Sequence, residues 1–192
     1  MLEDLELELD WIGFELDPTT PRGGRDLAEL FGSDRLAEMR AQLRNVAASL
    51  GVRMGEPPRV PNTRRALALV EQCRAAGAVD LARNALMDAH WVQGRDIGSD
   101  AVLADVARHA GLDPVAAVAG CDSPAWHARV DAMRETASRW GVTGIPTFFL
   151  LPEGWTEERL AEWSGPQPVR VVGSRSVAEL RAAARQVGAL PG

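Results

Sequence analysis

The chain of 192 residues contains no lysine, no tyrosine and only two cysteines, and it lacks an apolar run of the roughly twenty residues that cross a bilayer. All 21 positive charges are therefore arginines, and they are scattered along a chain whose net charge is −6. Phosphate binding needs a concentrated positive face, so neither nucleic acid nor a membrane is expected as a partner. With 46% hydrophobic and 25% charged residues, the composition predicts a folded, soluble protein.

The first residues, Met1 to Glu6, are acidic and offer neither the basic segment nor the apolar segment of a secretory signal peptide. We therefore expect a cytoplasmic location. The two cysteines, Cys73 and Cys121, lie far apart in the sequence and belong to no closely spaced pair, which excludes a disulfide framework.

The chain begins with a pattern typical of a strand. Residues 4–11 alternate between leucine or tryptophan and acidic residues, which predicts a strand with one face in solvent. The acidic face suits a strand near a sheet edge. We expect this strand to continue to Leu16 and to end at the prolines Pro18 and Pro21.

A long helical region follows, in which polar capping residues and glycines mark each helix. The expected helices are 33–51, 62–77, 80–94 and 99–111, capped by Ser33, Asn62, Asp80 and Ser99, then a short helix from Asp113-Pro114 and one from Ser123-Pro124 to Trp140. After Gly141 the pattern changes. We expect strands at 147–151 and 169–172, a loop insertion at 152–168 with a short helix near 157–163, and a last helix opened by the capping box Ser176 to Glu179.

Four segments together resemble one known family. They are Trp11-Ile12-Gly13-Phe14-Glu15-Leu16-Asp17-Pro18, Asn62-Thr63-Arg64-Arg65-Ala66, Gly141-Val142-Thr143-Gly144-Ile145-Pro146-Thr147-Phe148 and Val171-Val172-Gly173-Ser174-Arg175. In this order they resemble the DsbA-like branch of thioredoxin-fold proteins, which includes DsbA/FrnE-like oxidoreductases and 2-hydroxychromene-2-carboxylate isomerases. Leu67 departs from the pattern, because similar proteins often have histidine there.

The resemblance implies an α/β, thioredoxin-like fold with a large helical insertion. We expect the thioredoxin-like domain to comprise 1–24 and 124–192, and the helical domain to comprise 25–123. Family members place a reactive cysteine or serine at the start of a helix after their first strand, where unpaired N–H groups stabilise a thiolate. The ten residues before Trp11 are too few for that strand and helix, so we expect the N-terminal βα element to be missing. A start codon placed too late, direct pairing of the remaining strands, or another chain would each account for this.

Three functions follow from the resemblance. The first is a thiol-disulfide oxidoreductase that is inactive as this chain stands, since no Cys-X-X-Cys occurs in it. The second is a glutathione-dependent isomerase or transferase of the 2-hydroxychromene-2-carboxylate isomerase or kappa-class type. The third is a non-catalytic binding module. The expected partner is a thiol or disulfide substrate, or glutathione as the one candidate cofactor, and a homodimer is compatible with each function.

The resemblance also supplies candidate binding residues and no catalytic residue. It implies that the Ile145-Pro146 bond is cis and that Ile145, Pro146 and Thr147 contact a bound peptide or glutathione as a strand would. Ser174 and Arg175 could hold a glutathione carboxylate, although an ordinary polar turn explains them as well. Asn62 is expected first as a helix cap and second as a ligand contact.

The remaining chemically active side chains have simpler explanations. Cys73 and Cys121 could form a redox pair, but isolated thiols are the commoner case in a cytosolic protein. Residues His90, His109 and His127 lie on separate expected helices without metal-ligand spacing, which favours core or surface roles over a zinc site.

Overall fold

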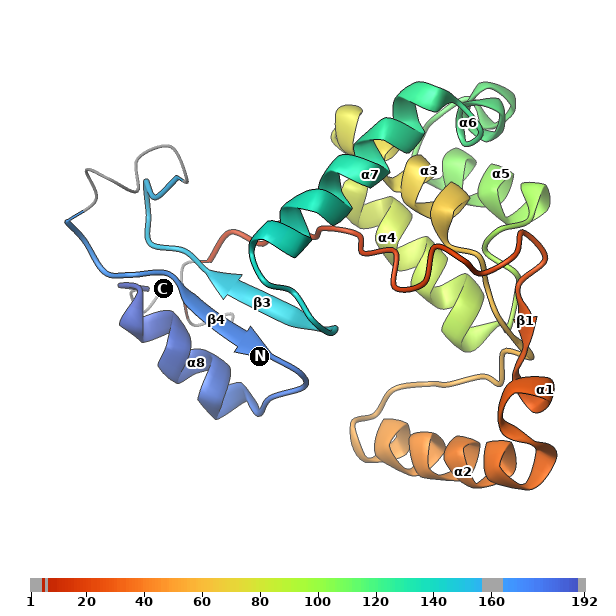
Figure 1. Ribbon diagram of the computed structural model, residues 1–192, viewed down its shortest axis with the longest axis horizontal. Coiled ribbons are helices and arrows are strands. Elements are labelled where there is room, and N and C mark those ends of the chain that lie inside the picture. The colour runs from red at the N-terminus through yellow and green to blue at the C-terminus, as the bar shows by residue number, and fades with distance from the viewer. Residues whose placement is uncertain (1–4, 6, 157–163, 190–192) are drawn as a thin grey trace. The chain divides into compact units, whose positions relative to one another are not determined.

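The computed structural model describes residue 5 and residues 7–156 and 164–189 (Figure 1). The chain forms two compact units, one of Met1–Asp10 with Ala137–Gly192 and the other of Trp11–Thr136. The expected domains 1–24 with 124–192 and 25–123 stay a prediction. The short helix expected near 157–163 lies outside the described residues. Within the described residues, no helix is long and apolar enough to span a membrane.

The unit Trp11–Thr136 is built from helices, and the capping pattern predicts all of them except the first, Leu27–Phe31. They are α1 Leu27–Phe31, α2 Ser33–Ser49, α3 Arg64–Ala75, α4 Val79–Met87, α5 Asp100–His109, α6 Pro114–Gly120 and most of α7 Pro124–Arg139. A core shared by α3 to α6 centres on Leu69 of α3 and Leu103 of α5, both fully buried, and it includes both cysteines. This core forms because the apolar faces of α3 to α6 meet in it.

Several expected caps are present and others are not. The Asn62 side chain accepts a hydrogen bond from the Arg64 N–H at 3.0 Å, and Asp113 accepts one from Ala116 at 2.7 Å. Ser33 and Asp80 were wrong as caps, because each lies inside the helix that it was expected to precede. Both predictions failed by a residue or so, which is the usual error when a boundary is placed from a single polar residue.

The helix expected over 80–94 is two elements. After α4, residues Asp88–Val92 form a π-helical turn, η1, whose wider backbone turn carries the buried side chain of His90. A π-helical turn depends on tertiary packing more than on local propensity, and no residue in this stretch signals it.

A small antiparallel sheet went unpredicted. Strand β1 Arg25–Asp26 pairs with β2 Arg59–Val60, with Arg25 opposite Val60 and Asp26 opposite Arg59. Asp26 also caps α1 by accepting hydrogen bonds from Ala28 and Glu29. This strand pairing attaches the segment with α1 and α2 to the rest of the Trp11–Thr136 unit.

The other unit contains strands β3 Thr147–Leu150 and β4 Val169–Val172 and helix α8 Val177–Gln186. The two strands are antiparallel, with Thr147 opposite Val172 and Leu150 opposite Val169, and α8 runs alongside them in Figure 1. The expected capping box is present, since the Glu179 N–H donates to Ser176 and the Glu179 carboxylate accepts from the Ser176 N–H. Both strands and the helix were therefore predicted correctly.

The strand expected over 4–16 was wrong. Among the described residues of this segment, only Leu5 makes a β-bridge, and 7–16 form no strand. The alternation does not mark a buried face either, because Leu9 and Leu16 are more than 60% exposed whereas Glu15 is buried. Alternation predicts a strand only where a neighbouring strand accepts its hydrogen bonds, and β3 is paired only with β4 in the described part of the chain.

Arginine side chains hold residues 11–15 instead. The Arg64 guanidinium pairs with Glu15 at 3.0 Å, Arg74 donates to the Trp11 carbonyl, and the Arg83 guanidinium lies 4.2 Å from the centre of the Trp11 ring. These contacts come from α3 and α4 and replace a strand ladder with side-chain bonds.

Candidate functional site

The loop between α7 and β3 carries the first candidate site. Its Ile145-Pro146 peptide bond is cis, as the resemblance implied. The Thr147 hydroxyl donates to the Gly144 carbonyl at 2.6 Å, and the Gly173 N–H donates to the Pro146 carbonyl at 2.8 Å. These two bonds fix the loop at the start of β3, while Ile145 remains 53% exposed and Pro146 is exposed as well.

The turn after β4 lies next to this loop. The hydrogen bond from Gly173 to Pro146 and the pairing of Thr147 with Val172 place Ser174 and Arg175 directly beyond it. Ser174 is exposed, but the Arg175 guanidinium donates to the Val172 carbonyl at 3.1 Å and lies 3.9 Å from Glu179. A ligand carboxylate would have to compete with these internal partners for Arg175.

Asn62, the remaining candidate, belongs to the other unit. Its amide nitrogen donates to the Thr20 carbonyl at 2.6 Å while its oxygen caps α3. Both polar atoms are therefore engaged within the Trp11–Thr136 unit, which supports the structural role expected first for this residue.

Among the described residues, one edge of β3 has no partner strand. In the described part of the chain β3 pairs with β4 on one side and with no strand on the other. An edge with free backbone N–H and C=O groups can accept an extended peptide as an added strand. The exposed Ile145 lies immediately before this edge.

A cluster of three aromatic rings packs next to this loop. The Trp140 ring lies edge-on to two other rings, with its centroid 4.8 Å from that of Phe149 and 5.8 Å from that of Trp155. In addition, the Arg170 guanidinium donates a hydrogen bond to the Gly141 carbonyl at 2.9 Å. Sequence reasoning did not find this role for Arg170, because an arginine in a strand gives no signal that it caps a helix on a neighbouring element. The cluster and this bond fix where α7 ends and the loop begins.

The order of the helical segment, the proline loop, the antiparallel pair and the last helix is that of a thioredoxin-like protein. A comparison with protein families matches residues 2–184 to the DSBA-like thioredoxin domain. The chain belongs to this family, and its fold is α/β and thioredoxin-like. A search of curated proteins found no match. The family is one of oxidoreductase and isomerase-type proteins.

Neither cysteine is placed to act as a nucleophile. Both side chains are fully buried in the core between α3 and α6, and the Cys121 thiol donates to the Ala117 carbonyl at 3.2 Å. Burial, with a smaller effect of Cys121, raises the pKa of Cys73 to about 11, and burial likewise raises the pKa of Cys121 to about 11. A reactive cysteine needs the opposite, an exposed thiolate of lowered pKa.

We therefore expect both thiols to react with a disulfide reagent only after unfolding. At about pH 8 a thiol of pKa about 11 is about 0.1% ionised, against about a quarter for a free cysteine. Labelling of the native chain should be at least about 100-fold slower than labelling in guanidinium chloride, where both cysteines should react. Fast labelling of the native protein would contradict their burial.

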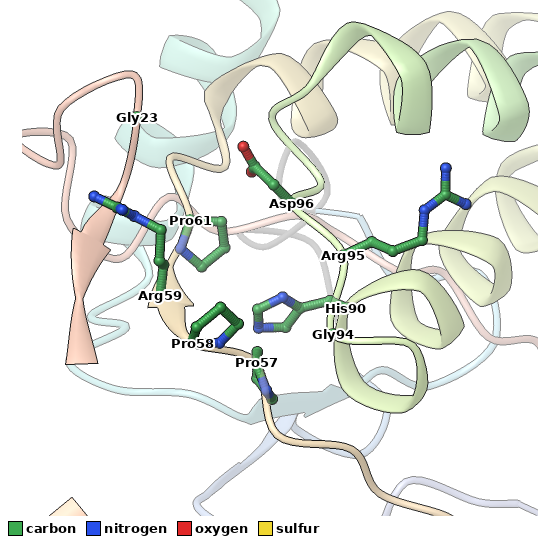
Figure 2. Close-up of a pocket in the computed structure, with 9 residues that line it drawn as sticks. All are labelled: Gly23, Pro57, Pro58, Arg59, Pro61, His90, Gly94, Arg95 and Asp96. Carbon is green, nitrogen blue, oxygen red and sulfur yellow. The ribbon is translucent and has the colours of Figure 1, made fainter. Parts of the chain in front are cut away.

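A second candidate site is a small cavity in the Trp11–Thr136 unit. Its volume is about 50 Å³, and its lining includes Pro57, Pro58 and Pro61 of the segment before α3. The imidazole of His90 faces these prolines from η1, as Figure 2 shows. The side chain is nearly buried, at 9% exposure, and its Nδ1 has no hydrogen-bond partner among the described residues.

Charged residues surround this cavity without turning into it. In Figure 2 the guanidinium groups of Arg59 and Arg95 point away from His90, and Arg95 pairs with Asp105 at 2.7 Å. Asp96 accepts a hydrogen bond from the Gly98 N–H at 2.9 Å. Among the described residues, no group of three or more His, Cys, Asp or Glu side chains could hold a metal ion. The cavity therefore does not fit an anion or a metal.

Proposed function

We propose that the chain binds a thiol- or disulfide-containing peptide in extended form along the open edge of β3, next to Ile145, Pro146 and Thr147. The observation that carries the proposal is the edge of β3 that has no partner strand in the described part of the chain, beside an exposed loop that two hydrogen bonds fix in place. A peptide would be held by backbone hydrogen bonds and by apolar contact with Ile145. The family membership supports a substrate of this class.

The chain's own cysteines would not take part in thiol exchange. Both are buried with raised pKa values. The proposed role of these 192 residues is thus substrate binding, and the thioredoxin-type exchange reaction requires a nucleophile other than Cys73 and Cys121.

Glutathione is the alternative ligand for the same edge. The observation that favours it is the exposed turn with Ser174, which the bond from Gly173 to Pro146 holds beside the loop. Glutathione would place its cysteine backbone against the β3 edge and a carboxylate at this turn. The engagement of Arg175 with Val172 and Glu179 weakens this alternative relative to a longer peptide.

The test measures binding and turnover separately. A peptide with one cysteine, its serine counterpart and reduced glutathione are titrated into the full chain, and amide chemical shifts are followed. The peptides should shift the amides of 143–150, whereas insulin reduction should not exceed the rate of free thiols. Ile145→Asp should weaken peptide binding about tenfold, since it removes the apolar contact.

Val115→Asp serves as the matched control, because Val115 is an equally apolar and even more exposed residue of the other unit, at 79%. It should leave binding unchanged. Binding of glutathione but of neither peptide would favour the alternative ligand. Turnover that disappears in Cys73→Ala or Cys121→Ala would overturn the proposal.

A further inference from the structure

The segment 55–61 is closely packed on η1 around His90. The Gly55 N–H donates to the Trp91 carbonyl at 2.5 Å, and a Cβ at Gly55 would lie 2.5 Å from the Val92 carbonyl oxygen, so only glycine allows this approach. Prolines 57, 58 and 61 then close over the imidazole. The titratable ring of His90 is thus enclosed where segment 55–61 contacts η1.

Two backbone carbonyls of this segment already accept hydrogen bonds from other elements. The Pro57 carbonyl accepts a hydrogen bond from Arg40 of α2 at 3.0 Å, and the Pro58 carbonyl accepts one from the Leu27 N–H at 3.0 Å. Proline rings offer no N–H and no polar side chain. A protonated imidazole has two N–H donors, whereas Nδ1 has no hydrogen-bond partner among the described residues and the Arg95 backbone is the acceptor that favours the charged ring.

The charges around His90 do not compensate for protonation. Arg59 from β2, Arg95 after η1 and Asp96 line the cavity, but both guanidinium groups point away from the ring and Arg95 pairs with Asp105. Two further anions are engaged elsewhere, since Glu56 pairs with Arg40 and Arg44, and Asp88 accepts from Gln93. A proton on His90 would therefore place a positive charge in an apolar cavity where Asp96 and the Arg95 backbone offset the cost of burial only in part.

We propose that His90 is a pH-sensitive latch, in which the neutral ring lets segment 55–61 close on η1 and protonation releases this segment, together with α2, from η1. Val52 and Met54 lie between α2 and this segment, and together with Met87 and Trp91 they line an apolar cleft of about 390 Å³. Acidification thus changes the shape of this cleft. The latch does not depend on the proposed peptide binding at β3.

The direction of the pKa shift agrees with this geometry. Burial lowers the pKa of His90 below its ordinary value of 6.5, and the Arg95 carbonyl and Asp96 only partly oppose the effect. A lowered histidine pKa in the closed state means that closure is fully favourable above about pH 6.5 and weakens as the pH falls through the closed-state pKa. In this interval the opening equilibrium rises up to about tenfold per pH unit.

Hydrogen exchange of the full chain tests the latch. Exchange at 55–61 and in α2 is compared between about pH 7.5 and about pH 5, the latter above the ordinary pKa values of Asp and Glu at about 3.9 and 4.3. After correction for intrinsic rates, exchange in both segments should increase at the lower pH, whereas α5 should not change. In His90→Phe, which keeps a ring and cannot titrate, the increase should disappear.

His109→Gln is the matched control, because His109 is an exposed histidine at the end of α5 and should leave the increase intact. His90→Gln is a second non-titrating variant in case the phenylalanine disturbs folding. An NMR titration of the parent gives an independent readout, in which the ring of His90 and the amides of Gly55 and Gly94 should share one midpoint below 6.5. An unchanged pH response in both His90 variants, or a midpoint at or above 6.5, would overturn the latch.

Discussion

Arg64→Met is expected to lower the free energy of unfolding by about 3 to 5 kcal/mol, because it leaves a buried carboxylate without its cation. The Arg64 guanidinium pairs with Glu15 at 3.0 Å and with both oxygens of Asp131 at 2.8 and 2.9 Å. The Glu15 side chain is only 3% exposed, whereas Asp131 is 40% exposed and would stay hydrated. The loss therefore comes from Glu15. Urea unfolding followed by circular dichroism measures it.

Two further variants separate this cause from a general loss of packing. Adding Glu15→Leu to Arg64→Met removes the unpaired charge and should recover most of the loss, since replacing a whole buried ion pair by apolar groups is often nearly neutral. Arg108→Ala, which breaks the exposed pair with Asp105, should change the free energy by no more than about 1 kcal/mol. A double variant as unstable as the single one would show that charge is not the cause.

Leu103→Ala should have a comparable effect, lowering the free energy of unfolding by about 2 to 5 kcal/mol. Leu103 lies at 0% exposure in the core shared by α3 to α6. Removing its side chain loses apolar burial and leaves a cavity among helices that pack on all sides. The same urea titration measures the loss.

Leu81→Ala is the control, because Leu81 lies on α4 but is 47% exposed. It should change stability by no more than about 1 kcal/mol, since the side chain loses little buried area and alanine favours a helix. If the two substitutions lowered the free energy of unfolding by similar amounts, Leu103 would not lie in the core of this unit.

The helices and the C-terminal strands could be predicted because their signals are local. A capping residue, an apolar stripe and a terminal glycine occur within one helix, as in α3, α6 and α8. The apolar run at β3 and the capping box of α8 are equally local. The proline loop was found by resemblance, since nothing in its composition requires a cis bond at Pro146.

Other features depended on partners distant in the sequence. The alternation over residues 4–16 is a good local signal for a strand, yet arginines of α3 and α4 hold residues 11–15 of this segment. The short pairing of β1 with β2 joins residues that no local pattern connects. The π-helical turn at Asp88–Val92 and the packing of prolines 57, 58 and 61 next to His90 likewise form only when segment 55–61 packs on η1.

The sequence by itself determined the helical content, the strands around Pro146 and, through four matching segments, the family. The tertiary structure decided which polar side chains are buried and therefore costly to disturb. Glu15, His90 and both cysteines look ordinary in the sequence, and only packing removes them from water. The desolvation of a side chain depends on all of its neighbours at once. Neither the energetic cost of burying these side chains nor their roles can therefore be derived from the local sequence pattern.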